Sequence, residues 1–217
     1  MAMSLNKAVL VIDYFDLLYP HSKCFLNYKT DYGFLIAVML SAQCTDQKVN
    51  KVTETLFEKY KSLNDLDKAS LYEIEEIIKP LGLYKVKARN IKGITKQLIN
   101  NYEGKVPSDK VEMMKLPGIG NKTSNVVRIE LFDIPEFPVD THIRRISNRL
   151  GIANTMDVLK IEDALKKTFE KKWIKLHHQF IEFGRDICKA QSPKCMECKL
   201  KNICIYYKEN NESKADK

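Results

Sequence analysis

Apolar residues recur at helical spacing along almost the whole 217-residue chain, whereas alternating β-branched runs of the kind that form strands are scarce. Residues 5–18, 46–60 and 86–101 each place apolar side chains on one face of a helix. Residues 34–42 read FLIAVMLSA and are apolar on every side, which predicts a central helix packed by others. The pattern therefore predicts an all-α protein.

Residues that start and stop helices support this pattern. Ser70 and Glu73 form a capping-box pattern, and Pro80 ends the helix that they begin. Ser108 or Asp109 is placed to cap a short helix. Further helices are expected at residues 121–132, after Asp140, at 158–171 and at 173–184, and the polar tail from Glu209 is expected to fray.

The chain carries an excess of positive charge. Lys and Arg number 36 against 28 Asp and Glu, which gives a formal net charge of +8. This balance favours an anionic partner, either nucleic acid or an acidic membrane surface. No apolar run approaches the ~20 residues that span a bilayer, and Asp13 and Asp16 interrupt the N-terminal apolar stretch, which therefore does not resemble a signal peptide. A cytoplasmic protein without a membrane partner is expected.

Four of the six cysteines lie close together near the C-terminus, with the spacing C-x6-C-x2-C-x5-C. They are Cys188, Cys195, Cys198 and Cys204. Thiolates at such spacing bind zinc or an iron–sulfur cluster. A four-cysteine zinc site usually has a pair of C-x2-C knuckles and this segment has only one, so the spacing favours a cubane cluster. Cys24 and Cys44 stand apart and are interpreted as ordinary buried cysteines, because disulfides are rare in the cytoplasm.

Lysines surround the cysteine segment. Lys189 and Lys194 lie between the first two cysteines, and Lys199 and Lys201 follow the third. One interpretation is that these lysines only solvate a surface loop. The other is that the loop is a rigid platform which holds lysines against phosphates, with Lys194 as a candidate contact.

The segment MMKLPGIGNKTSNVV predicts two helices joined by the tight turn 116–120. Gly118 and Gly120 are expected to allow positive φ and close approach of the backbone. The second helix then begins with free N–H groups and the positive end of its dipole, which together suit an anion such as a nucleic-acid phosphate. The alternative is an ordinary turn between helices, for which one glycine usually suffices.

Lys122 lies in the first turn of that second helix, where a cation opposes the helix dipole. Such an unfavourable position indicates a function, either as a phosphate-binding lysine or as a nucleophile. A lysine amine must be neutral to attack carbon, and the helix end, neighbouring cations and partial burial all favour the neutral form. Asp140, in PVDTHIRRI, is expected to cap the next helix and, if it faces the amine, to accept a proton or stabilise a cationic sugar.

Together these motifs resemble those of the endonuclease III family of DNA glycosylases, in the helix-hairpin-helix glycosylase superfamily. The resemblance covers roughly residues 5–208. The segments that carry it, in the order of the family, are MLSAQCTDQKVN at 39–50, GLYKVKARNI at 82–91, LPGIGNKTSNVV, PVDTHIRRISNRLGI and the cysteine pattern.

The resemblance implies an architecture of two all-α lobes with a DNA-binding cleft between them. One lobe, at residues 24–134, is a six-helix barrel that carries the helix-hairpin-helix. The other joins residues 1–23 to 135–217 and carries a [4Fe–4S] cluster in the loop 188–204, with the four clustered cysteines as ligands. The implied partner is duplex DNA that contains damaged bases or abasic sites, and a monomer is expected.

The resemblance also implies roles for residues of the proposed catalytic site. The catalytic lysine of the family falls on Lys122 and its catalytic aspartate on Asp140. His142 lies one turn into the helix of Asp140, where it either helps to position the aspartate or is structural. Asn121 departs from the basic residue often found before the catalytic lysine, which puts one phosphate contact in doubt and leaves the chemistry untouched.

The implied contacts with DNA come from several segments. The residue that fills the gap left by a flipped base falls on Gln43, and the apolar wedge falls on Leu83, with Leu81 as an alternative. The turn glycines and Lys194 are expected to contact phosphates. Between residues 83 and 105, basic side chains outnumber the single acid, Glu103, and are expected to follow a DNA strand. They are Lys85, Lys87, Arg89, Lys92, Lys96 and Lys105.

The implied activity is that of a bifunctional DNA glycosylase and abasic-site lyase, which flips oxidised pyrimidines out of duplex DNA, removes them and cuts the strand by β-elimination in base excision repair. Two alternatives are kept. A monofunctional mismatch glycosylase would lack a lysine at the position of Lys122. A non-catalytic helix-hairpin-helix protein would only bind DNA, and its function would survive Asp140→Asn.

Overall fold

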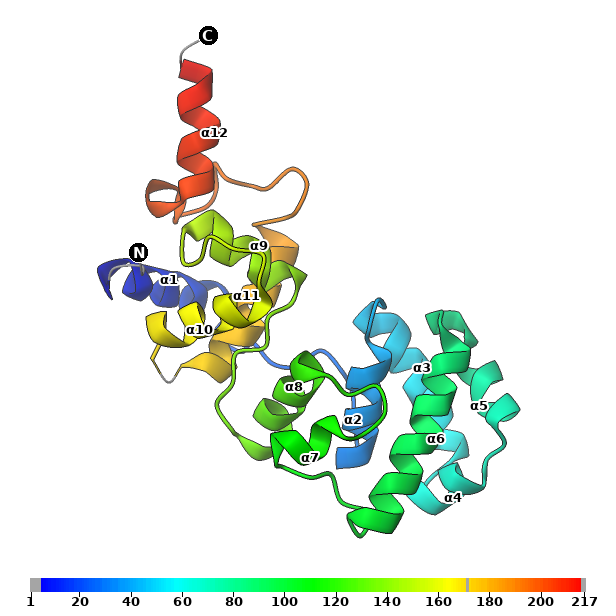
Figure 1. Ribbon diagram of the computed structural model, residues 1–217. Coiled ribbons are helices and arrows are strands. Elements are labelled where there is room, and N and C mark those ends of the chain that lie inside the picture. Colours follow the sequence, from blue (N-terminus) through cyan, green and yellow to red (C-terminus); the bar gives the residue numbers. More distant parts are fainter. Residues whose placement is uncertain (1–4, 171, 216–217) are drawn as a thin grey trace. The chain divides into compact units, whose positions relative to one another are not determined.

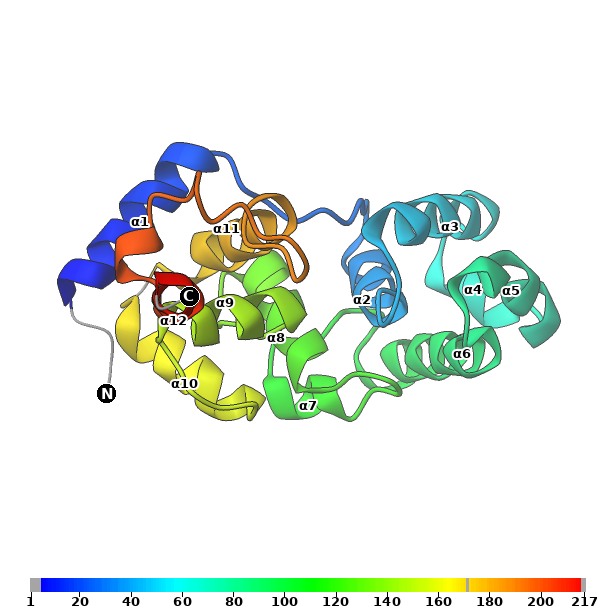
Figure 2. The ribbon, with the colours of Figure 1, turned by 90° about the horizontal axis from the view of Figure 1, so that it is seen from above.

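A computed structural model describes the chain over residues 5–170 and 172–215, with side chains up to Asn210. Over these residues the chain forms α-helices and two short 3-10 helices and no β-strand, which confirms the all-α prediction. It divides into two compact units, Cys24–Ile134 and the combination of Met1–Lys23 with Pro135–Lys217 (Figure 1; Figure 2). The first unit holds the hairpin, and the second holds the cysteine segment.

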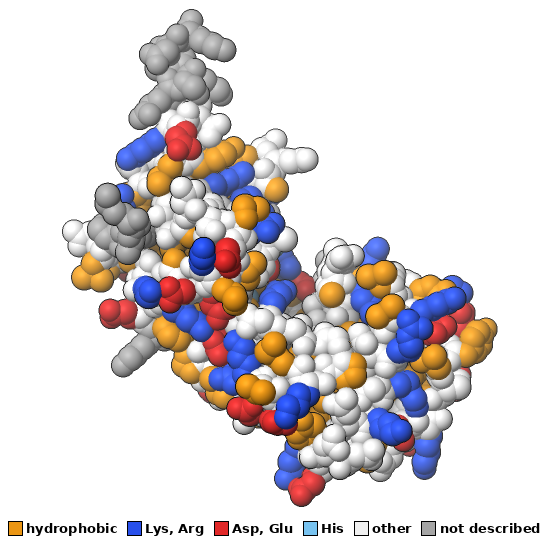
Figure 3. Space-filling model, viewed as in Figure 1, with side chains coloured by type: hydrophobic (Ala, Val, Ile, Leu, Met, Phe, Trp, Pro, Cys, Tyr) orange, Lys and Arg blue, Asp and Glu red, His pale blue; other side chains and the backbone are white. Residues whose placement is uncertain are grey.

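Charged side chains of both signs lie on the surface. On the face shown in Figure 3, Lys and Arg side chains are interspersed with Asp and Glu rather than gathered into one continuous patch. The apolar helix α2 (Asp31–Leu40) has only 10 residues, where a bilayer span needs about 20. In the described part of the chain no helix combines the length and the apolar character that crossing a membrane requires.

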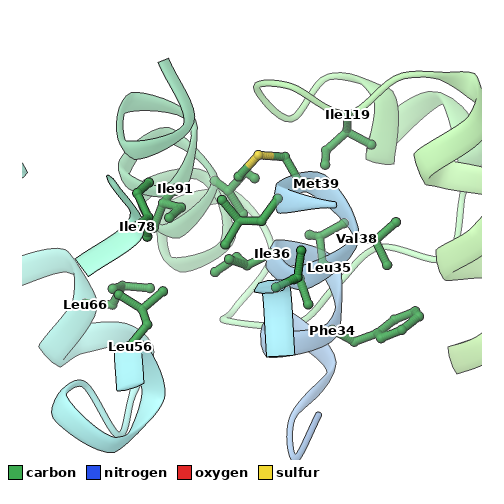
Figure 4. Close-up of a cluster of buried hydrophobic side chains, with 14 of the residues drawn as sticks. Phe34, Leu35, Ile36, Val38, Met39, Leu56, Leu66, Ile78, Ile91 and Ile119 are labelled. Atoms are coloured by element: carbon green, nitrogen blue, oxygen red, sulfur yellow. The ribbon is translucent and has the colours of Figure 1, made fainter. Parts of the chain in front are cut away.

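The unit Cys24–Ile134 is built around α2. Every residue of this helix from Gly33 to Leu40 is buried, as predicted for a helix that is apolar on all sides. Helices α3, α6 and α8 pack against it, and Figure 4 shows its side chains among those of Leu56, Ile91 and Ile119. The elements of the unit are α2, α3 (Asp46–Lys59), α4 (Leu63–Lys68), α5 (Leu71–Ile78), η1 (Lys79–Leu81), α6 (Tyr84–Asn101), α7 (Lys110–Met114) and α8 (Asn121–Phe132).

Side-chain caps fix where most of these helices begin. A threonine caps each of α2 and α3. Ser70 and Glu73 make both hydrogen bonds of the predicted capping box at α5, and Asp109 rather than Ser108 caps α7. Helices α6 and α8 are different, because they begin after Leu83 and Gly120 and have no side-chain cap.

Two details of the helix pattern were predicted wrongly. Helix α4 was missed, because its 6 residues bury only Leu66 and so give no readable period. The central helix begins at Asp31 rather than at residue 34, because the Thr30 side chain accepts the Gly33 N–H and starts the helix earlier than its apolar run.

The second unit joins the N-terminal helix to the C-terminal ones. Its elements are α1 (Leu5–Leu18), α9 (Thr141–Leu150), α10 (Val158–Thr168), α11 (Trp173–Asp186), η2 (Lys201–Ile203) and α12 (Ile205–Ala215). Helix α11 packs against α1 and α9, and its Phe180 ring meets Phe15 and Phe137 at centroid distances of 5.0 and 5.7 Å. The tail that was expected to fray from Glu209 instead continues α12, and position 171, where one predicted helix ends, lies outside the described residues.

Candidate functional site

The turn of the hairpin needs its first glycine. Gly118 has φ +76°, in the left-handed region, and a Cβ added there would clash with the Asn90 amide and lie 3.3 Å from Met39 Cγ. On either side of it, Leu116 and Ile119 are buried and anchor the turn to the core, and Figure 4 shows Ile119 reaching toward the end of α2. Both the backbone conformation and the packing therefore require glycine at 118.

Gly120 corrects the prediction made for it. Its φ is −102° and its ψ −176°, an extended conformation that any residue adopts. A Cβ at this position would meet no other atom within 4 Å. Packing within the protein therefore does not require glycine at this position. Because Gly120 has no side chain, the first turn of α8 and the positive end of its dipole stay uncovered.

Lys122 lies in the first turn of α8 and is exposed. In the described part of its own unit the side chain has no hydrogen-bond or ion-pair partner. A cation at a helix N-terminus is unfavourable for stability, and Lys122 gains no compensating contact within the unit. An unfavourable position without a compensating contact indicates that Lys122 has a role in chemistry or in binding an anion, and not in stabilising the fold.

Asp140 is the N-cap of α9, as the sequence predicted. Its Oδ1 accepts the Ile143 backbone N–H at 2.8 Å, and the side chain is half-buried. In the described part of its unit, Oδ2 has no hydrogen-bond partner. The cap thus holds an ionisable group in a fixed place and leaves one oxygen available. Lys122 belongs to the other unit, so the meeting of these two residues stays a prediction.

His142 is held by Arg145 rather than by Asp140. Arg145 Nη2 donates to His142 Nδ1 at 3.1 Å and to the Gly184 carbonyl at 2.9 Å. Because an arginine only donates, His142 Nδ1 acts as the acceptor and carries no proton. Burial lowers the pKa of His142, which favours this neutral ring. These contacts tie His142 to α11, and a part for it in positioning Asp140 stays a prediction.

The four clustered cysteines line one pocket in the second unit. Among the described residues, no three His, Cys, Asp or Glu side chains are arranged to hold a single metal ion. All four thiols line this pocket, and four cysteine thiolates are the ligand set that a [4Fe–4S] cluster takes. Burial raises the pKa of Cys198 to about 11, so this thiol gives up a proton when it becomes a ligand.

Two arginines of α9 hold the cysteine segment, and the sequence analysis did not identify them. Arg149 Nη1 donates to Cys188 Sγ at 3.4 Å and to the Lys189 carbonyl at 2.7 Å. Arg145 Nε donates to the Cys188 carbonyl at 2.9 Å. The sequence contains a pattern that could have identified them. The two arginines are spaced i,i+4 in THIRRISNRL and therefore share one face of the helix. They attach the ligand loop to the helix that Asp140 begins.

Lys194 is less available than predicted. Its Nζ lies 3.1 Å from Asp186 Oδ1 in an ion pair at the surface, and this carboxylate raises the pKa of Lys194. Surface ion pairs are weak and are readily exchanged for another anion. One of the three N–H donors of Lys194 is therefore already used by Asp186, whose negative charge also offsets that of the lysine.

Gln43 and Leu83 share an unusual backbone. Both are exposed, and both have left-handed φ angles, +59° and +49°. Such values are uncommon outside glycine and are an outlier for leucine. Leu83 is 62% exposed whereas Leu81 is 5% exposed and belongs to the core, which leaves Leu83 as the candidate wedge. Neither the conformation nor the exposure of Leu83 stabilises the fold, so both point to a function.

The basic stretch of α6 is divided by the structure. Lys87 is 4% exposed, and Lys92 Nζ donates to the carbonyls of Leu66 and Ala69 at 3.4 and 3.0 Å. These two lysines therefore do not follow a DNA strand, contrary to the prediction. Lys105 is exposed and follows the end of α6. The exposed members of the stretch within α6 share one stripe of this helix at i, i+4 and i+11. They are Lys85, Arg89 and Lys96.

Comparisons with known proteins give independent evidence. Residues 36–171 match the model of the HhH-GPD superfamily of base excision DNA repair proteins, and residues 188–204 match the iron–sulfur binding domain of endonuclease III. Endonuclease III of Bacillus subtilis (strain 168) is 45% identical over 204 residues, 93% of each chain. Endonuclease III of Synechocystis is 39% identical over 206 residues, 94% of each chain. A solved structure of a trapped endonuclease III–DNA covalent intermediate is 44% identical, with a TM-score of 0.91 over 96% of this chain and 99% of that one.

The cysteine pocket predicts the metal content of the protein. Protein purified without oxygen should be yellow-brown and hold about four irons per chain, because four thiolates bind one [4Fe–4S] cluster. Cys198→Ser should lose the cluster and loosen the segment 188–204 more than the core of the other unit, measured by iron analysis and hydrogen exchange. A colourless protein with one stoichiometric zinc would contradict the prediction.

Proposed function

The chain belongs to the endonuclease III family of the HhH-GPD superfamily, and we propose that it removes oxidised pyrimidines from duplex DNA with Lys122 as the nucleophile. It is a bifunctional glycosylase and abasic-site lyase of base excision repair. One observation carries the assignment of the nucleophile. Lys122 offers an exposed amine without a partner in its unit, and a relative of 44% identity is known as a covalent intermediate with DNA.

The proposed reaction begins with the amine. Neutral Nζ of Lys122 attacks C1′ of the damaged nucleotide, and the bond between C1′ and the base breaks, with its electron pair leaving on the base. The nitrogen then loses one proton. Its lone pair forms the bond to C1′ as the C1′–O4′ bond breaks and O4′ takes up a proton, which opens the sugar ring and gives an iminium, the Schiff base. Removal of a proton from C2′ then expels the 3′ phosphate oxygen, which cuts the strand by β-elimination.

Asp140 suits two tasks in this reaction. Its Oδ2 is not used by the helix cap, so it can accept the proton that the lysine must lose before it attacks. The same negative oxygen can stabilise the positive charge that develops on the sugar as the base departs. A cap that fixes the carboxylate through Oδ1 keeps this second oxygen in one place, which lowers the entropic cost of reaching the reactive geometry.

The damaged base must leave the stack before the amine can reach C1′. We assign Gln43 to the space that the base vacates and Leu83 to a wedge between bases of the opposite strand. The left-handed backbone and the exposure of both residues support this assignment. Gly118 and Gly120 let a phosphate approach the start of α8, and the exposed basic stripe of α6 suits the neighbouring backbone.

The chain holds a [4Fe–4S] cluster. We propose Cys188, Cys195, Cys198 and Cys204 as its ligands, because they line one pocket. When bound, the cluster supplies four strong thiolate bonds that close the loop, and Arg149 places positive charge beside the ligand Cys188. We further propose that the protein works as a monomer, in the cytoplasm or at the nucleoid, where its substrate DNA lies.

A monofunctional mismatch glycosylase is disfavoured, because such relatives lack a nucleophilic lysine where this chain has Lys122. A protein that only binds DNA could use Lys122 for a phosphate but would have no need of Lys122 together with the free oxygen of Asp140. Both alternatives are separated from the proposal by one pair of variants.

Lys122→Gln should bind duplex DNA with one oxidised pyrimidine and give no covalent adduct on borohydride reduction, because an amide forms no Schiff base. Asp140→Asn should also bind and should lower turnover by about 10²–10⁴-fold, while asparagine keeps the cap of α9. The two losses should not multiply, because residues that act as one unit are non-additive. Single-turnover kinetics and circular dichroism measure both effects.

Full activity of Asp140→Asn would reduce Asp140 to a helix cap. A Lys122→Gln protein that is still trapped by borohydride would place the nucleophile at another residue. Lys51→Gln is a matched control, because Lys51 is an exposed lysine on α3 of the same unit, and this variant should be trapped as efficiently as the wild type.

DNA affinity should fall steeply with salt, because the chain has a net charge of +8. If about five phosphates are neutralised, log K should change with log salt with a slope of roughly −4 to −5. Lys194→Ala should make the slope less negative by about 1 and weaken damaged and undamaged duplex equally, whereas Lys194→Arg should retain the slope of the wild type. A slope near zero, measured by fluorescence anisotropy, would show that the charges are only solvated.

A further inference from the structure

One buried lysine joins two loops that are far apart in the sequence. Lys87 of α6 is 4% exposed. Its Nζ donates to the Ala42 carbonyl at 3.0 Å, to the Leu81 carbonyl at 3.2 Å and to Cys44 Sγ at 3.2 Å. The three N–H donors of an ammonium group are thus matched by three acceptors, two on one loop and one on the other.

Cys44 closes this arrangement into a ring of hydrogen bonds. Its thiol accepts from Lys87 and donates to the Leu81 carbonyl at 2.8 Å. The Leu81 carbonyl therefore receives two donors, one from α6 and one from the loop that follows α2. We refer to Lys87, Cys44 and the carbonyls of Ala42 and Leu81 as the lysine bracket.

The lysine bracket lies directly beside the two residues assigned to enter DNA. Ala42 and Cys44 flank Gln43, and Leu81 lies two residues before Leu83. Left-handed backbone at a residue other than glycine is unfavourable and persists only where the surroundings enforce it. Gln43 and Leu83 both have this backbone, and the bracket supplies hydrogen bonds that hold the residues next to them.

A second lysine of α6 shows what a purely structural contact looks like. Lys92 donates to the carbonyls of Leu66, Asp67 and Ala69 at the end of α4. It stabilises the C-terminus of that helix, where unpaired carbonyls carry partial negative charge. None of these carbonyls belongs to the loops of Gln43 and Leu83. Lys92 is therefore a control of the same residue type on the same helix, and like Lys87 it donates to backbone carbonyls.

We propose that Lys87 is a positioning residue, which fixes the spacing between Gln43 and Leu83 so that both enter the same damaged site in one step. This inference rests on the proposed function, since it takes Gln43 and Leu83 as the residues that enter the duplex. Lys87 itself is buried and touches neither DNA nor the reacting atoms. Its effect is to fix the position of Gln43 relative to Leu83, two residues that lie on loops far apart in the sequence.

The test uses the full-length protein with its cluster and two substrates. One is a duplex with a single oxidised pyrimidine, whose removal needs the base to leave the stack. The other is a single strand with an abasic site, which has no opposite base and no stack to enter. Lys87→Met keeps an unbranched side chain of similar length and removes the donors. It should lower kcat/KM on the duplex relative to the single strand by about 10- to 100-fold, the scale of a misplaced contact.

Two comparisons decide whether Lys87→Met lowers the activity on the duplex through Gln43 and Leu83. Lys92→Met should lower the melting temperature while leaving the ratio of the two activities unchanged within about twofold. In a protein that already carries Gln43→Ala and Leu83→Ala, Lys87→Met should cause no further loss on the duplex. An equal fall of both activities in Lys87→Met, an unchanged ratio, or a full further loss in the double-alanine background would each overturn the proposal.

Cys44 offers a second variant that keeps the lysine. Cys44→Ser retains a group that accepts from Lys87 and donates to Leu81, whereas Cys44→Ala removes it. Cys44→Ala should lower the duplex-to-single-strand ratio by about 2- to 10-fold, as expected for one hydrogen bond, and Cys44→Ser should restore it. Equal ratios in these two variants would contradict the bracket even if Lys87→Met failed to fold. A wild-type protein inactive on both substrates would instead refute the proposed function.

Discussion

The first turn of an α-helix leaves backbone N–H groups without partners inside the helix, and the chain meets this constraint differently at its two candidate catalytic helices. Helix α9 begins with an Asp140 cap that uses one carboxylate oxygen. Helix α8 begins with Gly120 and no side-chain cap. One helix start thus fixes a carboxylate, and the other exposes its dipole beside Lys122. The chemistry assigned to both residues depends on these two helix starts.

Basic side chains have a second function inside this protein, besides any contact with DNA. Lys87 joins two loops, and Lys92 caps the end of α4. Arg145 and Arg149 attach the cysteine segment to α9. In each case a long side chain donates several hydrogen bonds to backbone carbonyls, which fixes irregular segments that helical packing alone does not hold. The positive charge of the composition therefore overstates the charge available to phosphates.

Much of the fold could be predicted from the sequence, because the helices are long, periodic and capped. The apolar run of α2, the capping box at Ser70 and the cap at Asp140 were all identified. Helix α4 is too short to show a period, and the helical continuation of the polar tail in α12 carries no apolar face to reveal it. Hydrophobic periodicity identifies a helix through its buried apolar face, so a helix without such a face is not detected from the sequence.

The sequence was sufficient to predict which residues form the candidate site. It was not sufficient to predict their backbone conformations, their burial or their hydrogen-bond partners. Lys122 stands out because it breaks a local rule, Asp140 because it is placed to start a helix, and the cysteines because they have the spacing of metal ligands. Gly120 was assigned a positive φ that it does not have, and Lys87 was counted with the surface charges although it is buried. Backbone angles and burial arise from tertiary packing, and sequence spacing does not contain them.

The identity of the nucleophile is the centre of the account, and peptide mapping of the trapped complex tests it most directly. Wild-type protein would be reduced with borohydride on a duplex that holds one oxidised pyrimidine, digested, and sequenced by tandem mass spectrometry. The account predicts a sugar remnant on Nζ of Lys122. A remnant on any other lysine, or no covalent adduct at all, would contradict it.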